Sequence, residues 1–323
     1  MSHQVMPDIY RIEIPIPNSP LKAVNSYIIK SPERNLIIDT GLNREICVEV
    51  MLSALKKLNI KMENTDIFIT HMHADHAGMV ATLSSDTSKV YCSRVDGNEI
   101  FPTNDYWDSM RKGARAHGFP IKEVENALNT HPGYKYSSSP IELSIVKNGD
   151  IIRVGDYQFR CVATPGHTKG HMCLYEPAKR LLISGDHILG NITPNVSLFR
   201  TEDGNPLHDY LLSLDKVYQL DIELVLPGHR DIISNHRKRI NELKQHYLIR
   251  ASEILPILDL GSMDAYTVAS KMSWDIVSPS WEEFPVAQKW FATGEAIAHL
   301  KYLEEEGKVK SEIINDINIF SLI

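Results

Sequence analysis

Three histidines and one aspartate are crowded into a short run of the chain, at His71, His73, Asp75 and His76. Their spacing is H-x-H-x-D-H. A loop that leaves a strand can turn alternate side chains toward one point, and the Asp-His pair can then open a helix that faces a second point. Imidazole and carboxylate groups are ligands that zinc and similar divalent ions prefer. Because crowded histidines repel each other once protonated, the run favours a metal centre over a plain surface cluster.

Three more residues of ligand type follow in the chain, and each comes just after a run that is typical of a β-strand. They are His167 and His229, each in a Pro-Gly-His motif, and Asp186 in a Ser-Gly-Asp motif. One histidine after a glycine is a weak indication by itself. Strand ends on one edge of a sheet can converge, however, so the three together indicate a shared site.

The elements that would position these residues alternate between strands and helices, which predicts a layered α/β fold. Residues 45–58 carry apolar side chains at helical spacing and predict a helix. Runs rich in Ile, Val and Tyr predict the strands, at residues 9–16, 24–30, 36–39, 66–70, 141–146, 151–154, 157–163, 172–175, 180–184 and 224–226.

Residues 97–140 differ in composition from the predicted strands, because they contain many aromatic residues. We expect them to be a partly helical insertion that forms a lid over the metal site. Trp107, Arg111 and Arg115 follow one another at intervals of four and share one helical face. An aromatic ring and two guanidinium groups would suit an anionic, partly apolar substrate. The alternative is a solvated basic face on a loop that packs through Trp107.

The last part of the chain, residues 236–323, predicts a small winged-helix-like domain after a catalytic domain of residues 1–235. Its helices are expected at 238–258, 265–272 and 286–306, followed by a β-like pair around 308–310 and 318–322. Residues 238–323 carry nine Lys or Arg against thirteen Asp or Glu, so their net charge is −4 and they suit a phosphate backbone poorly. We expect this region to pack through four aromatic side chains, either on the catalytic domain of the same chain or on another subunit of a homo-oligomer. They are Trp274, Trp281, Trp290 and Phe291.

The composition of the whole chain is that of an ordinary globular protein. Its 323 residues include 34 basic and 41 acidic residues, giving a net charge of −7. No apolar run reaches the roughly 20 residues that cross a bilayer, and the first residues lack the pattern of a signal peptide. The four cysteines form no C-x-x-C pair. We therefore expect a cytoplasmic protein with no membrane partner.

These motifs, in this order over residues 8–235, resemble those of the metallo-β-lactamase-fold superfamily, in the hydrolase branch with seven metal ligands seen in glyoxalase II. The resemblance implies a four-layer αββα sandwich and two divalent metal ions per chain, with zinc as the default and iron or manganese as alternatives. It assigns one ion to His71, His73 and His167, the other to Asp75, His76 and His229, and the bridging position to Asp186. It also implies that Asp39 orients a ligand from behind, and His187 is a candidate for a similar supporting role.

Two metal ions that share a hydroxide would make a nucleophile at neutral pH. We therefore expect a dinuclear hydrolase that attacks an ester, thioester or lactone of a small molecule, with Asp75 orienting the hydroxide or relaying a proton. Asp186 stands where true β-lactamases of this fold usually have cysteine, which argues against antibiotic hydrolysis. The alternatives are a metal-dependent ribonuclease of the same fold and a non-catalytic protein that binds nucleic acid, and the acidic C-terminal region disfavours both.

Overall fold

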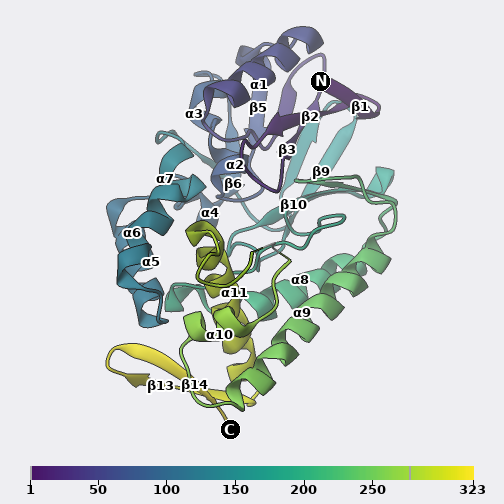
Figure 1. Ribbon diagram of the computed structural model, residues 1–323. Coiled ribbons are helices and arrows are strands. Elements are labelled where there is room, and N and C mark those ends of the chain that lie inside the picture. Colours follow the sequence, from purple (N-terminus) through teal and green to yellow (C-terminus); the bar gives the residue numbers. More distant parts are fainter. Residues whose placement is uncertain (1, 276–277) are drawn as a thin grey trace.

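Two β-sheets packed face to face form the centre of the protein, and helices cover the outer face of each (Figure 1). The computed structural model describes residues 2–275 and 278–323. The first sheet has seven strands in chain order: β1 (Ser2–Met6), β2 (Ile9–Pro15), β3 (Ala23–Ile29), β4 (Asn35–Ile38), β5 (Thr65–Phe68), β6 (Val90–Ser93) and β7 (Ser144–Val146). The second has five, in the spatial order β12 (Leu224–Pro227), β11 (Leu181–Gly185), β10 (Met172–Glu176), β9 (Tyr157–Ala163) and β8 (Ile151–Val154).

Neighbouring side chains of a strand point to opposite faces of a sheet, and both faces of the central strands are buried. In β3, Tyr27 packs between the two sheets, whereas Ile28 packs under the helices of the first sheet. In β11, Ile183 packs between the sheets, and Leu182 faces the helices of the second sheet. Double burial explains why these strands are almost wholly apolar in sequence. The expected four-layer αββα architecture is confirmed.

The helices fall into three groups along the chain. The first sheet is covered by α1 (Glu45–Leu58), α2 (Ala74–Ala77) and α3 (Val80–Leu83). The insertion between β6 and β7 holds α4 (Arg94–Gly97), α5 (Asn104–Ala116), α6 (Ile121–Thr130) and α7 (Pro132–Tyr136). The third group lies on the side of the second sheet and consists of α8 (Pro206–Tyr218), α9 (His236–Leu258), α10 (Ala265–Lys271) and α11 (Val286–Glu305). Single 3₁₀ turns lie at Met62–Asn64, Pro177–Lys179 and Thr201–Asp203.

The predicted strands and helices are present, mostly within one to three residues of their expected ends, but the structure also has strands β1 and β6 and helices α3 and α8, which the sequence did not predict. The edge strand β1 is short and polar, and it pairs with β2 only. Helix α8 was overlooked although its start carries a recognisable signal. Asn205 caps it by accepting a hydrogen bond from the backbone N–H of His208, and Pro206 occupies its first turn.

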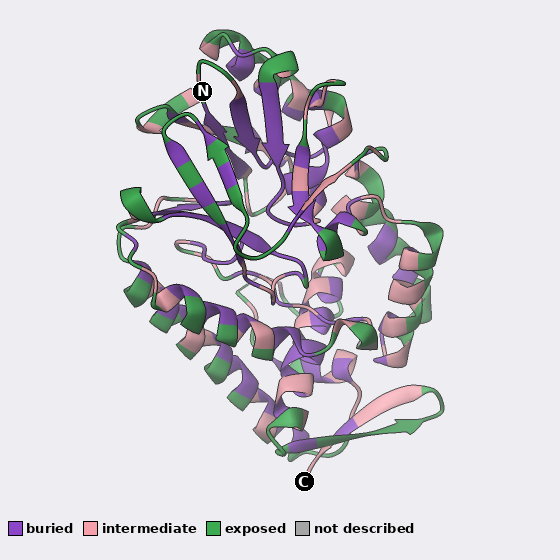
Figure 2. Cartoon of the chain, turned by 180° about the vertical axis from the view of Figure 1, so that it is seen from behind, coloured by how far each residue is buried: buried purple, intermediate pink, exposed green. Residues whose placement is uncertain are grey.

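The C-terminal helices are packed on the rest of the same chain. Trp290 of α11 stacks on Phe199 with ring centroids 4.3 Å apart, and its ring meets Phe119 of the insertion edge-on at 5.4 Å. The antiparallel hairpin of β13 (Val309–Ile314) and β14 (Ile317–Leu322) completes the region, and most of its side chains are exposed or half-buried (Figure 2). The description of this region as a separate winged-helix-like domain stays a prediction. None of the helices in the described residues is long and apolar enough to cross a membrane.

Candidate metal centre

The H-x-H-x-D-H run lies in the turn that joins β5 to α2, at one end of the first sheet (Figure 1). His71 is buried, and its Nε2 lies 3.1 Å from Nδ1 of His73. His73 immediately precedes α2, which carries Asp75 and His76. The turn thus spreads its four polar side chains around two neighbouring points, as the spacing predicted.

The three remaining residues reach the same place from ends of the second sheet. His167 follows β9, and its Nε2 lies 3.2 Å from Nε2 of His71. Asp186 and His229 follow β11 and β12, which run parallel and end side by side. Gly228 has to be a glycine here, because a Cβ at this position would lie 2.4 Å from Oδ1 of Asp186.

The seven ligand atoms form two groups that meet at Asp186. In the first group, nitrogen atoms of His71, His73 and His167 lie within 4.8 Å of one another. In the second, Nε2 of His229 lies 3.4 Å from Oδ2 of Asp75, and His76 belongs to the same group. Asp186 touches both groups: one oxygen is 3.5 Å from Nε2 of His76, and the other is 3.7 Å from Nε2 of His167.

Oxygen atoms behind the histidines fix which ring nitrogen faces the centre. Nδ1 of His76 lies 2.7 Å from a carboxylate oxygen of Asp39. Nδ1 of His167 and of His229 each lies 2.7 Å from a backbone carbonyl, that of Asn195 and that of Ala23. A proton held on Nδ1 by these acceptors leaves the lone pair of Nε2 free for a metal ion.

The donor set also fits divalent metal ions because three of its buried polar atoms lack a hydrogen-bond partner in the described residues. Nε2 of His76, Oδ1 of Asp186 and Nε2 of His229 are buried and have no hydrogen-bond partner among the described residues. Buried polar atoms without a partner cost free energy. Metal coordination would satisfy all three, and five imidazoles with two carboxylates suit zinc, iron or manganese.

The two groups differ in their affinity for protons. Burial and the neighbouring histidines lower the pKa of His71 well below its usual range and that of His73 to about 3. Burial opposes protonation of His76 and His229 as well, but the carboxylates of Asp186 and Asp75 outweigh it. They raise the pKa of His229 to about 10 and that of His76 well above its usual range. Without metal, the first group is therefore neutral, whereas the second carries protons.

His171 hydrogen-bonds to the backbone of Asp186 and belongs to none of the candidate metal-binding groups of the described residues. Its Nε2 accepts a hydrogen bond from the backbone N–H of Asp186 at 3.2 Å, and its Nδ1 lies 2.8 Å from Oγ1 of Thr164. Both ring nitrogens are thereby occupied. His187 is buried beside it, with ring centroids 6.1 Å apart, and neither of its own ring nitrogens has a partner among the described residues. His187 thus packs behind the centre, and a specific supporting role for it stays a prediction.

Asp96 joins the two loops that carry His71, His73 and His167, and the sequence did not predict this role. Its buried carboxylate accepts hydrogen bonds from the backbone N–H of Met72 at 3.0 Å and of Gly170 at 2.6 Å, and from the hydroxyl of Thr168 at 2.6 Å. Burial raises its pKa to about 6, although these three donors favour the charged form. Asp96 holds the loop of His71 and His73 against the loop of His167.

The insertion lies next to the candidate metal centre through its last helix, α7. Helix α7 packs against α2, and His131 caps α7 by accepting the N–H of Gly133. Burial lowers the pKa of His131 to about 4, although the negative charge of Asp75 acts in the opposite direction. Trp107 is buried next to this ring, with centroids 5.4 Å apart.

Arg111 and Arg115 lie on the outer side of α5. The guanidinium of Arg111 is paired with Asp108 at 2.9 Å and with Glu125 at 2.9 Å, and Arg115 is exposed. Within the described residues, no hydrogen bond or ion pair joins either arginine to the seven ligands. Trp107 points into the core instead of joining them. Substrate binding by these three residues stays a prediction.

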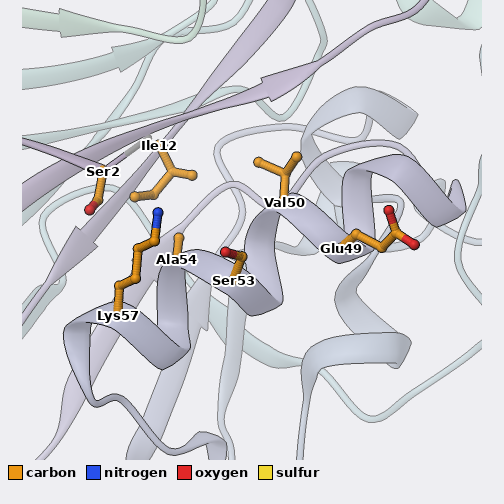
Figure 3. A pocket seen from close by; sticks show the side chains of 7 residues that line it. All are labelled: Ser2, Ile12, Glu49, Val50, Ser53, Ala54 and Lys57. Atoms are coloured by element: carbon orange, nitrogen blue, oxygen red, sulfur yellow. The ribbon is translucent and has the colours of Figure 1, made fainter.

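A shallow pocket of about 220 Å³ lies elsewhere, between α1 and the first strands (Figure 3). Its walls include Ile12, Glu49 and Lys57, and it contains none of the seven ligands. One carboxylate and one amine stand in its lining, and such a pair does not make a metal-binding group.

Several known proteins are similar to more than two thirds of this chain. The chain is 28% identical over 222 residues to an atrochrysone carboxyl ACP thioesterase of Aspergillus fumigatus, covering 69% of this chain and 55% of the relative. It is 25% identical over 246 residues to the acyl-coenzyme A thioesterase MBLAC2 of Homo sapiens, covering 70% and 79%. The crystal structure of the metallo-beta-lactamase family protein TTHA1429 from Thermus thermophilus superposes with a TM-score of 0.84 and 26% identity, over 99% of this chain and 100% of that one. The model of the metallo-beta-lactamase superfamily matches residues 20–229, and the chain belongs to this superfamily.

Proposed function

We propose that this protein is a dinuclear metal-dependent hydrolase whose substrate is a small-molecule acyl thioester. The observation that carries the proposal is the convergence of seven ligand atoms into two groups that share Asp186. Zinc is the metal we expect, with iron or manganese as alternatives. When bound, two such ions supply a hydroxide nucleophile from water at neutral pH and polarise the carbonyl oxygen of the substrate.

Asp75 is placed to orient the attacking water. Its side chain is 18% exposed, whereas those of His76 and His229 are fully buried, so Asp75 faces the open side of the centre. Burial alone would raise the pKa of Asp75, but His76 and His229 hold it well below its usual range. Because so acidic a carboxyl group is a weak base, it can accept a hydrogen bond from water and orient it, and of the two roles expected for Asp75 this orienting role is favoured over a proton relay.

The cysteines do not offer a competing nucleophile. Burial raises the pKa of Cys92, Cys161 and Cys173 to about 12, and it raises the pKa of Cys47 as well. Only the thiolate is a good nucleophile, so thiols with raised pKa values are inert at neutral pH. Hydrolysis by a Cys-based acyl-enzyme is therefore disfavoured.

Thioesters are chosen over oxygen esters and lactones because two relatives are named as thioesterases, one for acyl-coenzyme A and one for an acyl carrier protein. The test is a panel of acyl-coenzyme A substrates, matching oxygen esters, lactones and single-stranded RNA, with the metal content measured in the same samples. We expect thioester turnover with two ions per chain and intact RNA. Cleavage of RNA without thioester turnover would instead establish the ribonuclease alternative.

Asp186→Ala is the matched inactive control for this panel. It removes the carboxylate that touches both groups, so metal content and turnover should fall together. His71→Ala and His229→Ala should each lower the occupancy of a different ion, because their ligand atoms belong to different groups. If metal analysis finds one ion or none per chain in protein purified without a chelator, the dinuclear proposal is wrong.

The charge of the substrate can be tested at Arg111 and Arg115. If α5 binds an anionic part of the substrate, the double alanine variant raises KM for anionic thioesters more than for neutral ones. Metal content should not change, and the loss of exposed ion pairs should cost at most about 1 kcal/mol of stability. Equal effects on both substrate types would leave α5 as scaffold only.

A further inference from the structure

The metal ligand His167 is held by a segment that lies on the C-terminal helices. Nδ1 of His167 donates to the backbone carbonyl of Asn195 at 2.7 Å, which leaves its Nε2 directed at the first group of ligands. Asn195 lies in the segment between β11 and α8. This carbonyl can hold the imidazole in place only if the segment itself is fixed.

Helix α11 fixes that segment by both backbone and side-chain contacts. The N–H of Leu198 donates to the carbonyl of Gly294 at 3.0 Å. Gly294 allows this approach, because a Cβ there would meet the side chains of Phe199 at 2.8 Å and Ser197 at 3.0 Å. The side-chain amide of Asn195 donates to a carboxylate oxygen of Glu295 at 3.4 Å, one residue further along α11.

Glu295 is in turn held by Arg250 of α9. Burial raises the pKa of Glu295, and Arg250 opposes this from 3.4 Å on the carboxylate oxygen that faces away from Asn195. Arg250 also contacts Glu253 at 2.6 Å on the side away from Asn195, and its guanidinium stacks over the ring of Trp274 at 4.4 Å, which holds it in place. A continuous set of contacts therefore runs from the C-terminal region to the ligand.

We propose that Glu295, held in place by Arg250, is a positioning residue for His167, so that the C-terminal helices set the affinity of the first metal ion. The inference rests on the metal centre of the proposed function but not on its substrate. Residues that orient a histidine ligand through its second nitrogen typically contribute 10- to 100-fold to metal affinity. Here the direct partner is the carbonyl of Asn195, and Glu295 acts one contact further away, so its contribution should lie at the lower end of that range.

The test measures Zn²⁺ affinity by competition with a chromophoric chelator, without any substrate. All variants are made in a His229→Ala background, which leaves the three histidines of the first group intact. We expect Glu295→Met to weaken binding of the first ion by about 10-fold at most, because it acts on His167 only through Asn195. Glu295→Gln should recover most of the affinity, because its side-chain oxygen can still accept the amide of Asn195.

Glu253→Gln is the matched control, since it removes a carboxylate from the same arginine on the side away from Asn195. Its Zn²⁺ affinity should stay within about twofold of the background. Asn195→Ala is a second disrupting variant should Glu295→Met fold poorly, and it should weaken binding in the same direction. Co²⁺ absorption then reports the geometry of the first site, and it should change in Glu295→Met but not in Glu253→Gln.

Equal Zn²⁺ affinities for Glu295→Met, Asn195→Ala and the background would overturn the inference. Equal losses in Glu295→Met and Glu253→Gln would do so too, because they would indicate general destabilisation. Both results leave the proposed hydrolase intact. Failure of the wild-type chain to bind any metal would overturn the inference and the proposed function together.

Discussion

Asp39 and His76 form a buried carboxylate–imidazole pair, with Oδ2 of Asp39 2.7 Å from Nδ1 of His76. The other oxygen of Asp39 accepts the backbone N–H of Thr70 at 2.8 Å, at the residue before the first ligand. Asp39 adopts a left-handed backbone conformation with φ of 58°, which a residue other than glycine rarely takes. One side chain thus sets the direction of His76 and the path of the loop that carries His71.

Asp39→Asn should remove the second metal ion while the protein stays folded. The amide oxygen can still accept the N–H of Thr70, but the amide nitrogen would face Nδ1 of His76. His76 would then carry its proton on Nε2, the atom that lies 3.5 Å from Asp186 and is needed for the metal. We expect metal analysis to give about one ion per chain, with at least a 10-fold loss in affinity for the second.

Asp39→Ala is the companion variant, and it should also lower stability by about 1–3 kcal/mol, because the buried N–H of Thr70 loses its acceptor. Two ions bound to Asp39→Asn with wild-type affinity would contradict this role for Asp39.

The convergence of the seven candidate ligands could be predicted from the sequence, because each stands in or next to a short motif at the end of a strand. An apolar strand followed by a glycine or a turn is a local pattern, and parallel strands such as β11 and β12 bring their ends together. Asp39 also follows an apolar strand, but its supporting role was expected from the resemblance to the superfamily and not from that position. The sequence pattern therefore contained both the ligands and the topology that gathers them.

The supporting residues could not be predicted in this way, because they act over long distances in sequence. Asp96 stands in a plain helical turn, yet it binds the backbone 24 and 74 residues away. Glu295 lies 100 residues from Asn195. Neither belongs to a local motif, and a buried acid is recognised only when its donors are seen in the structure.

Asp96→Ala should loosen both histidine loops. The variant would leave the backbone N–H groups of Met72 and Gly170 without their acceptor. Each buried N–H group without an acceptor lowers the free energy of unfolding by about 1–3 kcal/mol. We expect a loss of about 2–4 kcal/mol in the free energy of unfolding and a lower metal content.

Ser93→Ala provides the control for Asp96→Ala. Ser93 caps α4 by accepting the N–H of Asp96 at 3.1 Å, and its loss should cost about 1 kcal/mol without changing the metal content. Urea unfolding and metal analysis of the two variants separate these effects. Similar results for both would mean that Asp96 acts as a helix-capping neighbour and not as a link between the loops.

The chain should not bind RNA appreciably, because most basic residues of its C-terminal helices are already paired with carboxylates. Arg250 contacts Glu253 and Glu295, and Lys289 contacts Glu123 at 3.2 Å. Non-specific binding depends on cations that are free to neutralise phosphates. A titration of labelled single-stranded RNA at physiological salt should give a Kd weaker than roughly 10⁻⁴ M. Micromolar binding that falls steeply with salt would contradict this and revive the ribonuclease alternative.

Acidification should remove the metal ion of the second group before that of the first. In the metal-free protein the pKa of His229 is raised to about 10 and that of His76 is also raised, so a metal ion must displace protons there throughout the neutral range. Each displaced proton lowers the apparent affinity about tenfold for every pH unit below the pKa. In the first group the pKa of His73 is lowered to about 3 and those of His71 and His167 are lowered too, so protons compete only at strongly acidic pH.

Metal analysis after dialysis at pH 8, 7, 6 and 5 should therefore show a fall from two ions to one, with the first ion retained. Calorimetry in buffers of different ionisation enthalpy supplies an independent check, because the second ion should release protons on binding whereas the first should release almost none. His229→Ala should leave only the step with little pH dependence. Equal pH dependence for both ions, or earlier loss of the ion held by His71, His73 and His167, would show that the carboxylates of Asp75 and Asp186 do not set the difference between the two groups.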